Sequence, residues 1–238
     1  MYVLGFLAAY FLMGVQKGAH RLGLQGKLLQ DLIFYMALGL VVGARLGYVL
    51  FYQFANLGYY LQHPIEIIAV WHGGMSFHGG FIGVVLASIL FCRVHKLPFL
   101  QLADVVIVTA PVGLFFGRMG NFINGELYGR ATSVPWAMIF PSSPGVPRHP
   151  SQLYEAGLEG VVLFLVLWML KDRINRPGAL VALFLAGYGA MRFVVEFFRE
   201  PDAHIGLFMG LLSMGQFLCL AMILAAGLLW VLLPREGS

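Results

Sequence analysis

The chain has 238 residues, of which 60% are hydrophobic and only 11% are charged, and its mean hydropathy is +0.82. Soluble domains carry roughly 25% charged residues, so this composition excludes an ordinary soluble globular domain, a disordered chain and a disulfide scaffold. The net charge of +4 and the pI near 9.2 are typical of a membrane protein with basic cytoplasmic loops, and we expect no nucleic-acid partner. Cys92 and Cys219 lie within apolar runs, which indicates buried thiols.

At about 20 residues per crossing, the length accommodates six or seven membrane-spanning helices. The first apolar stretch, at 2–15, is short for a crossing, so we expect the natural chain to start further upstream. Further spans are predicted at about 28–54, from the segment around His78 to about 91, and at about 100–116, 152–170, 177–198 and 206–233. We therefore predict an all-α polytopic membrane protein of about seven transmembrane helices, forming one membrane-embedded domain over 1–238.

The segment after the fourth span is polar, rich in glycine and proline, and too long for a hairpin turn. It predicts a small ordered head built mainly from 121–150. Orientation follows from the lysines and arginines of short loops, which favour the cytoplasmic side. One set of helix ends holds nine of them and the opposite set holds three, so the N-terminus and the head are predicted to be periplasmic and the C-terminus cytoplasmic. The nine are Lys17, Arg21, Lys27, Arg93, Lys96, Lys171, Arg173, Arg176 and Arg235, and the three are Arg130, Arg148 and Arg199.

Ionisable residues within spans cost roughly 2.5–3.5 kcal/mol each at a helix centre, so they point to function. Six stand out: Asp31, Arg45, Asp104, Arg118, Arg192 and Glu196. The three arginines fall in or near the outer halves of their spans, and guanidinium groups that converge there would suit an anionic head group. The alternative is that each pairs with a carboxylate for packing, as the i, i+4 spacing of Arg192 and Glu196 would allow. Binding is favoured for Arg118 and Arg192, and the two interpretations are balanced for Arg45.

The densest group of polar residues lies at 117–130, with the sequence GRMGNFINGELYGR. Its four glycines allow close backbone approach or positive φ, and between them lie two guanidinium groups, two amides and one carboxylate. A helix cap followed by a loop would explain the glycines but not so many hydrogen-bonding side chains. In an outer-face loop of a membrane protein, the pattern predicts a site for a polar substrate.

His78 lies between glycines in GGMSFHGG at 73–80, at the start of a predicted span. A neutral imidazole there can act as a general base toward a thiol or hydroxyl, although an interfacial hydrogen-bonded histidine is the commoner case. A zinc site from His72, His78 and His149 is disfavoured because the spacing matches no metal motif and no cysteine ligand is near. Ser151 and Glu155 fit an N-cap and a first-turn carboxylate, for which a structural account is sufficient.

Two other classes of protein are compatible with parts of this pattern. A lipid or anion transporter would also place arginines within the bilayer, but it should show paired half-helices or an inverted repeat, and the sequence has neither. A structural membrane subunit would not need the density of polar groups between Arg118 and Arg130. A different phospholipid-using transferase is the closest chemical alternative, and composition and spacing alone do not exclude it.

Four segments together resemble the prolipoprotein diacylglyceryl transferase family. They are 73–80, 117–129, 148–155 (RHPSQLYE) and 187–199 (GYGAMRFVVEFFR). The resemblance covers nearly the whole chain. It implies an enzyme of the bacterial inner membrane that moves the diacylglyceryl group of phosphatidylglycerol to the lipobox cysteine of a preprolipoprotein, forms a thioether and releases glycerol phosphate.

The resemblance also implies roles for individual residues. His78, Arg192 and Tyr188 are the expected catalytic residues, with His78 as the candidate base. The expected substrate-binding residues are Arg118, Asn121, Glu126 and Gly129. The expected partners are phosphatidylglycerol, the preprolipoprotein signal peptide and the bilayer. No cofactor and no metal are expected, and the protein is expected to be a monomer.

Members of this family usually carry a His-Trp-Tyr-Gly-like stretch before the first span, with a functional tyrosine. The present sequence begins after that point, so a late start or a shortened chain is expected.

Overall fold

The computed structural model describes residues 1–200, 207–208 and 212–233, and the chain forms two compact units. Unit 1 comprises Met1–Ala19 and Ala103–Ser238, and unit 2 comprises His20–Leu102. Within the described residues the named secondary-structure elements are helices, apart from one short antiparallel pair, β1 (Leu207–Phe208) with β2 (Leu212–Ser213). The predicted all-α class is therefore confirmed.

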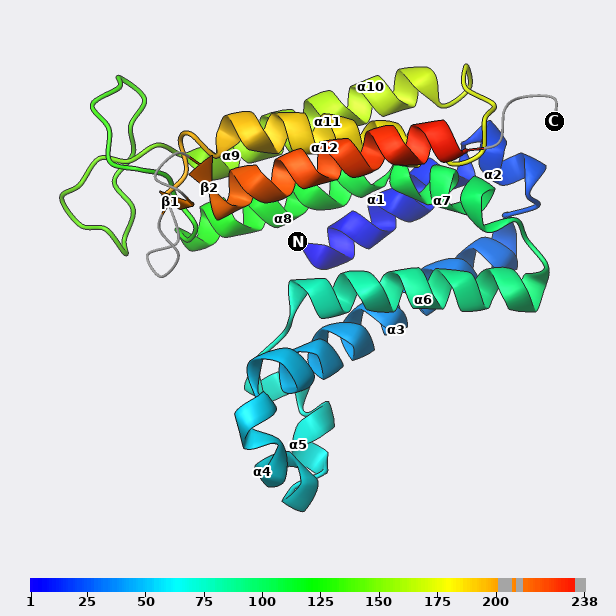
Figure 1. Cartoon of the computed structure of the whole chain (residues 1–238), viewed down its shortest axis with the longest axis horizontal. Helices are drawn as coiled ribbons and strands as arrows, with labels where there is room; N and C mark the ends of the chain where they lie inside the picture. Colours follow the sequence, from blue (N-terminus) through cyan, green and yellow to red (C-terminus); the bar gives the residue numbers. More distant parts are fainter. Residues whose placement is uncertain (201–206, 209–211, 234–238) are drawn as a thin grey trace. The chain divides into compact units, whose positions relative to one another are not determined.

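Unit 1 is a bundle of helices that lie alongside one another (Figure 1). In chain order these are α1 (Tyr2–Gly14), α8 (Ala110–Asn124), α9 (Ser151–Glu155), α10 (Leu163–Leu170), α11 (Ala179–Val195) and α12 (Met214–Leu232). The chain passes between the units within α2 (Lys17–Arg21) and α7 (Phe99–Ile107). Helices α9 and α10 are joined by a π-helical segment, η4 (Ala156–Val162), so that 151–170 runs as one long helix.

The core of unit 1 is apolar and lies where α10 and α11 meet. Val108, Leu163, Leu167 and Leu180 are buried there, and partly buried aromatic side chains pack around them. Asp104, one of the ionisable residues predicted within spans, contacts the start of α11. Its carboxylate accepts the N–H groups of Gly178 at 2.6 Å and Val181 at 3.1 Å. A carboxylate at a helix N-terminus satisfies free N–H groups and complements the helix dipole.

Unit 2 consists of two long helices and a short-helix excursion between them. The long helices are α3 (Gly26–Gly47) and α6 (Phe77–His95). The excursion contains η1 (Tyr48–Tyr52), η2 (Phe54–Asn56), α4 (Leu57–Gln62), α5 (Ile65–Ile68) and η3 (Val70–His72). Figure 1 shows α3 and α6 side by side, with α4 and α5 beyond one end of the pair.

Helices α3 and α6 come into backbone contact along a row of glycines. Gly39, Gly43 and Gly47 recur at every fourth position of α3 and face Gly79 and Gly83 of α6. A Cβ built at Gly43 would lie 2.7 Å from the Cα of Gly83, closer than real Cβ contacts come. Small residues at four-residue spacing are a common means of close helix approach in membranes.

Four helices are long and apolar enough to cross a membrane: Gly26–Tyr52, Phe77–His95, Ser151–Leu170 and Met214–Leu232. A fifth candidate is the pair Phe99–Ile107 and Ala110–Asn124, which is bent by 41°. Val3–Gly14 and Ala179–Val195 are shorter apolar helices. The predicted spans near 28–54 and 152–170 coincide with long helices. Part of the start of the predicted span 206–233 lies outside the described residues. Arg235 also lies outside them.

The glycine contact predicts that two alanine substitutions in unit 2 differ strongly in their effect on stability. Gly83→Ala should lower the free energy of unfolding by about 1–3 kcal/mol, because the new methyl group overlaps α3 backbone. Gly58→Ala is the control, since nothing lies within 4 Å of a Cβ at that position of α4. Unfolding in detergent, followed by circular dichroism, compares the two variants. Equal stability of the two would contradict the backbone contact.

Candidate functional site

The polar segment at 117–130 is helical in its first half. Helix α8 continues to Asn124 and ends at Gly125, whose φ of 66° is the left-handed cap conformation. Arg118 and Asn121 therefore lie on a helix, whereas Glu126 and Gly129 lie beyond it. The first four residues of the predicted head, 121–124, belong to this helix.

Arg118 and Arg192 are brought together by a residue that was not among the predicted site residues. The same oxygen of Glu155, Oε2, lies 2.6 Å from Nε of Arg118 and 2.8 Å from Nη1 of Arg192. The three side chains come from α8, α9 and α11. Glu155 is only 1% exposed, so its charge is held inside the bundle by the two guanidinium groups.

Two further carboxylates complete what we call the arginine–glutamate cluster: Arg118, Arg192, Glu155, Glu159 and Glu196. Glu159 is fully buried, 3.6 Å from Arg192 Nη1 and 4.0 Å from Arg118 Nη2. Glu196 lies 3.1 Å from Arg192 Nη2, which confirms the predicted i, i+4 pair. Both oxygens of Glu159 and Oε1 of Glu155 are buried without a hydrogen-bond partner in the described part of the chain. Such costly groups are concentrated at functional sites.

The local backbone explains how Glu159 reaches this cluster. It lies in η4, and π-helical turns inserted into α-helices are common at functional sites. Gly160 allows η4 to approach α8, because a Cβ there would lie 2.7 Å from Cβ of Phe115. The sequence held a signal for both residues. Glu155 and Glu159 are carboxylates four residues apart in an otherwise apolar stretch, and burying them in a membrane is expensive.

Asn121 and Glu126 meet at a different place on α8. The side-chain N–H groups of Asn121 and Asn124 donate to Oε1 of Glu126, at 2.9 Å and 3.2 Å. These hydrogen bonds lower the pKa of the Glu126 carboxyl, Asn121 having the larger effect. The three residues border a cavity of about 290 Å³, whose other lining residues are Met1, Gly117, Gly120 and Ile123. Neither Arg118 nor Gly129 is among its lining residues, so the predicted substrate-binding residues fall into three groups.

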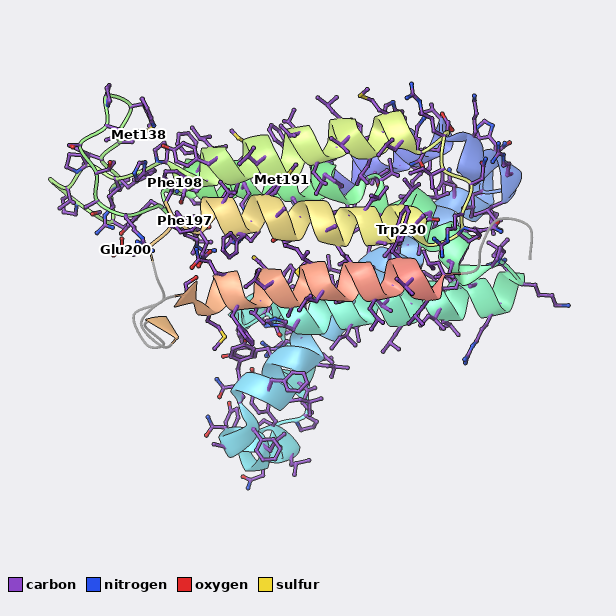
Figure 2. All side chains as sticks on the ribbon, turned by 45° about the horizontal axis from the view of Figure 1, so that its top comes forward. Met138, Met191, Phe197, Phe198, Glu200 and Trp230 are labelled. Carbon is purple, nitrogen blue, oxygen red and sulfur yellow. The ribbon has the colours of Figure 1, made fainter. Side chains whose placement is uncertain are left out.

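Gly129 lies where the head segment meets the end of α11. Its N–H donates to the carbonyl of His149 at 2.9 Å, and a Cβ there would collide with the carbonyl oxygen of Phe198. Arg148 donates to the Gly129 carbonyl at 3.2 Å and pairs with Glu200 at 2.6 Å. Figure 2 shows Phe198 and Glu200 at this end of unit 1, on the side of Met138. A glycine is therefore required here by close packing of backbone.

An apolar cavity of about 750 Å³ lies near the same end, between the long helix 151–170 and α11. Its polar edge is a chain of hydrogen bonds. Trp136 Nε1 donates to the Tyr154 hydroxyl at 2.7 Å, and that hydroxyl lies 3.1 Å from Nδ1 of His149. The apolar walls include Leu158, Val162, Val194 and Phe198.

His78 belongs to unit 2. It is exposed in the first turn of α6, whose N-cap Ser76 accepts the N–H of Gly79 at 3.2 Å. Tyr188 belongs to unit 1, where its ring stacks on Phe184 with centroids 5.8 Å apart, one turn before Arg192 on α11.

The contacts of Arg45 differ from those expected. No carboxylate partner of Arg45 is found among the described residues of unit 2, and its guanidinium donates to backbone carbonyls instead. These are the oxygens of Glu66 at 2.6 Å, Ile67 at 3.2 Å, Gly73 at 2.5 Å and Gly74 at 3.1 Å. Arg45 is only 4% exposed and lies over the Tyr48 ring. It fixes the loop that leads into α6.

Comparison with known proteins identifies relatives over the full length. A family model described as "Prolipoprotein diacylglyceryl transferase" matches residues 1–232. The chain is 54% identical over 236 residues to the phosphatidylglycerol–prolipoprotein diacylglyceryl transferase of Geobacter sulfurreducens, covering 99% of this chain and 90% of that protein. It is 52% identical over 245 residues to the protein of the same name from Bordetella avium, and 52% identical over 238 residues to that of Methylobacillus flagellatus. These matches cover 100% and 98% of this chain and 90% and 89% of the relatives.

The shared carboxylate predicts that Glu155→Gln is strongly destabilising. Removing its charge leaves two largely buried guanidinium groups without their common partner, which should cost about 3–5 kcal/mol of unfolding free energy. Glu200→Gln is a matched control, because Glu200 also lies 2.6 Å from an arginine but is 51% exposed. Removing the Glu200 charge should lower the free energy of unfolding by less than about 1 kcal/mol. Denaturant titration in detergent measures the free energy of unfolding of both variants. Similar losses would contradict the stabilising role of the Glu155 carboxylate.

Proposed function

Because this chain belongs to the prolipoprotein diacylglyceryl transferase family, we propose that the arginine–glutamate cluster binds the phosphate of its lipid donor. The chain is a transferase that moves a diacylglyceryl group from phosphatidylglycerol to prolipoproteins. The acceptor is the lipobox cysteine thiol of the signal peptide. Sulfur attacks the glyceryl carbon that carries the phosphate, the carbon–oxygen bond breaks, and a thioether and glycerol phosphate result.

The geometry of the two arginines is the observation that supports this proposal. Glu155 contacts Nε of Arg118 and Nη1 of Arg192, and this fixes both guanidinium planes before a ligand arrives. Arg118 Nη2 lies 4.0 Å from Glu159, beyond hydrogen-bond distance, and can donate to a phosphate oxygen. Negative charge grows on that phosphate as the carbon–oxygen bond breaks. Preorganised donors stabilise such developing charge more than the ground state.

The nucleophile requires a base, and we assign that role to His78. A free thiol has a pKa near 8.5, so it is mostly protonated at neutral pH and must lose its proton to attack. The exposed imidazole at the start of α6 is able to take that proton. Tyr188 orients the donor from α11. Asn121, Glu126 and Gly129 bind the head group or hold the loop that does so, and the hydrogen-bonding side chains of Asn121 and Glu126 beside their cavity suit a glycerol head group.

Apolar acyl chains need a separate environment, and unit 1 contains one. The cavity of about 750 Å³ has apolar walls from the long helix 151–170 and α11. Tyr154 and Trp136 at its edge are residue types that favour the membrane interface. Both substrates carry apolar segments, so a cavity of this kind fits a lipid-modifying enzyme.

We propose that the chain is a monomeric, multi-pass protein of the bacterial inner membrane. The four long helices, the bent pair and the two shorter apolar helices would together give the seven predicted spans of one membrane-embedded domain. Arg176 contacts the Trp230 ring, and Figure 2 shows Trp230 at the opposite end of unit 1 from Met138 of the head. This supports a cytoplasmic C-terminus, with the head 121–150 and the N-terminus in the periplasm.

A lipobox peptide incubated with the purified chain and phosphatidylglycerol should gain one diacylglyceryl mass on its cysteine. Arg118→Ala should reduce the rate about 10²–10³-fold, the usual effect of losing one donor to developing charge. Arg93→Ala, an exposed arginine of α6, should retain activity. Mass spectrometry of the peptide reads out all three reactions. Full activity of Arg118→Ala would refute phosphate binding by the cluster.

Replacing the proposed base should give a loss that depends on pH. His78→Gln should lower turnover about 10²–10⁴-fold near pH 7, the usual contribution of general-base catalysis. The deficit should shrink toward pH 9, because the thiol then ionises without assistance. Initial rates from pH 6.5 to 9.5 test this. Undiminished turnover, or a deficit that is constant with pH, would exclude His78 as the base.

A further inference from the structure

The carboxylate of Glu196 is held between Arg192 and the first turn of α12. One oxygen, Oε2, lies 3.1 Å from Arg192 Nη2. The other, Oε1, accepts the hydroxyl of Ser213 at 3.1 Å. Glu196 is only 8% exposed and directly follows α11, which runs beside α12 (Figure 1). A carboxylate at a helix N-terminus is stabilised by the helix dipole.

Ser213 has a second set of contacts that fixes its position. It is the N-cap of α12, and its hydroxyl oxygen accepts the N–H of Gln216 at 3.1 Å. The Gln216 side chain accepts the N–H of Ser213 at 3.0 Å in return, which completes a capping box. The Ser213 hydroxyl therefore caps the helix and donates to Glu196 from one fixed position.

Gly215 leaves the room that this carboxylate occupies. A Cβ built at Gly215 would lie 2.5 Å from Oε1 and 2.7 Å from Cδ of Glu196. Gly215 is not among the glycines with positive φ, so any residue could adopt its backbone conformation. The requirement for glycine is therefore steric, and what it protects is the position of the Glu196 carboxylate.

We propose that Gly215 and Ser213 are positioning residues for Arg192, acting through Glu196. The Arg192 guanidinium contacts Glu155 and Glu159 at Nη1 and Glu196 at Nη2, and the first turn of α12 holds the carboxylate at Nη2 through Ser213. Moving Glu196 by the width of a methyl group releases Nη2 and lets the guanidinium turn. This inference rests on the proposed binding of the lipid phosphate by Arg192.

The test is Gly215→Ala, with KM measured separately for phosphatidylglycerol and for a lipobox peptide. KM for phosphatidylglycerol should rise at least about tenfold, since a misplacement of about 1 Å can cost ~10²-fold. KM for the peptide should stay the same. Gly227→Ala is the matched control on the same helix, because nothing lies within 4 Å of a Cβ there, and it should match the unchanged chain.

Shortening the carboxylate should repair the damage. In Gly215→Ala/Glu196→Asp, the loss of one methylene makes space for the new methyl group, so KM for phosphatidylglycerol should return most of the way to its original value. A general loss of packing would not be rescued in this way. If Gly215→Ala does not fold, Ser213→Ala tests the same link by removing only the hydroxyl, and it should raise the same KM.

Arg192→Gln separates this inference from the proposed function. If Arg192→Gln leaves both KM for phosphatidylglycerol and turnover unchanged, phosphate binding by Arg192 is wrong, and the positioning role is wrong with it. If Arg192→Gln raises that KM but neither Gly215→Ala nor Ser213→Ala does, only the positioning role is overturned. An equal rise in Gly215→Ala and Gly227→Ala would also overturn it.

Discussion

The carboxylate of Glu155, shared by Arg118 and Arg192, is the interaction on which the organisation of unit 1 depends. Charges inside an apolar bundle are tolerated only when each has a partner, because the surroundings cannot solvate them. Three helices therefore have to meet at one point and in one rotational setting. The π-helical η4 and the glycine at 160 are the local adjustments that allow this meeting.

Other charged contacts repeat the same logic along α11. Asp104 holds its first turn through two backbone N–H groups, and the Glu196 carboxylate holds its last turn against α12. Helix α11 is thus fixed at both ends by carboxylates, that of Asp104 from α7 and that of its own C-cap residue, Glu196. Arg192 lies near the second of these points, and a functional side chain gains precision when the helix that carries it cannot turn.

The elements that were predicted correctly are those with a continuous local signal. The long apolar runs predicted the helices at 26–52 and 151–170 to within a few residues. A membrane-spanning helix needs an apolar side chain at nearly every position, so the whole run carries the signal. The bend of 41° between α7 and α8 was not predicted. It falls beside Thr109 and Pro111, a weak local signal within the apolar run predicted at 100–116.

The candidate site also contains residues that a local pattern indicates and residues that none does. Arg118, Asn121 and Glu126 were predicted as site residues because they are crowded into a short polar segment. Glu155 was assigned to a helix terminus, since its partnership with Arg192 spans 37 positions and no local pattern reports it. The partners of Arg45 were missed for a related reason. Backbone carbonyls carry no signature in a sequence, so a side chain that binds them looks unpaired.

The way in which Arg45 holds its loop has an evolutionary consequence. Its four acceptors are main-chain oxygens, which every amino acid provides. The residues that carry these oxygens can therefore be exchanged by mutation with little effect on the clamp, provided that the backbone path through Gly73 and Gly74 is kept. Such a loop can diverge in sequence between species while it retains its shape, so sequence variability between Glu66 and Gly74 would be a poor guide to structural variability.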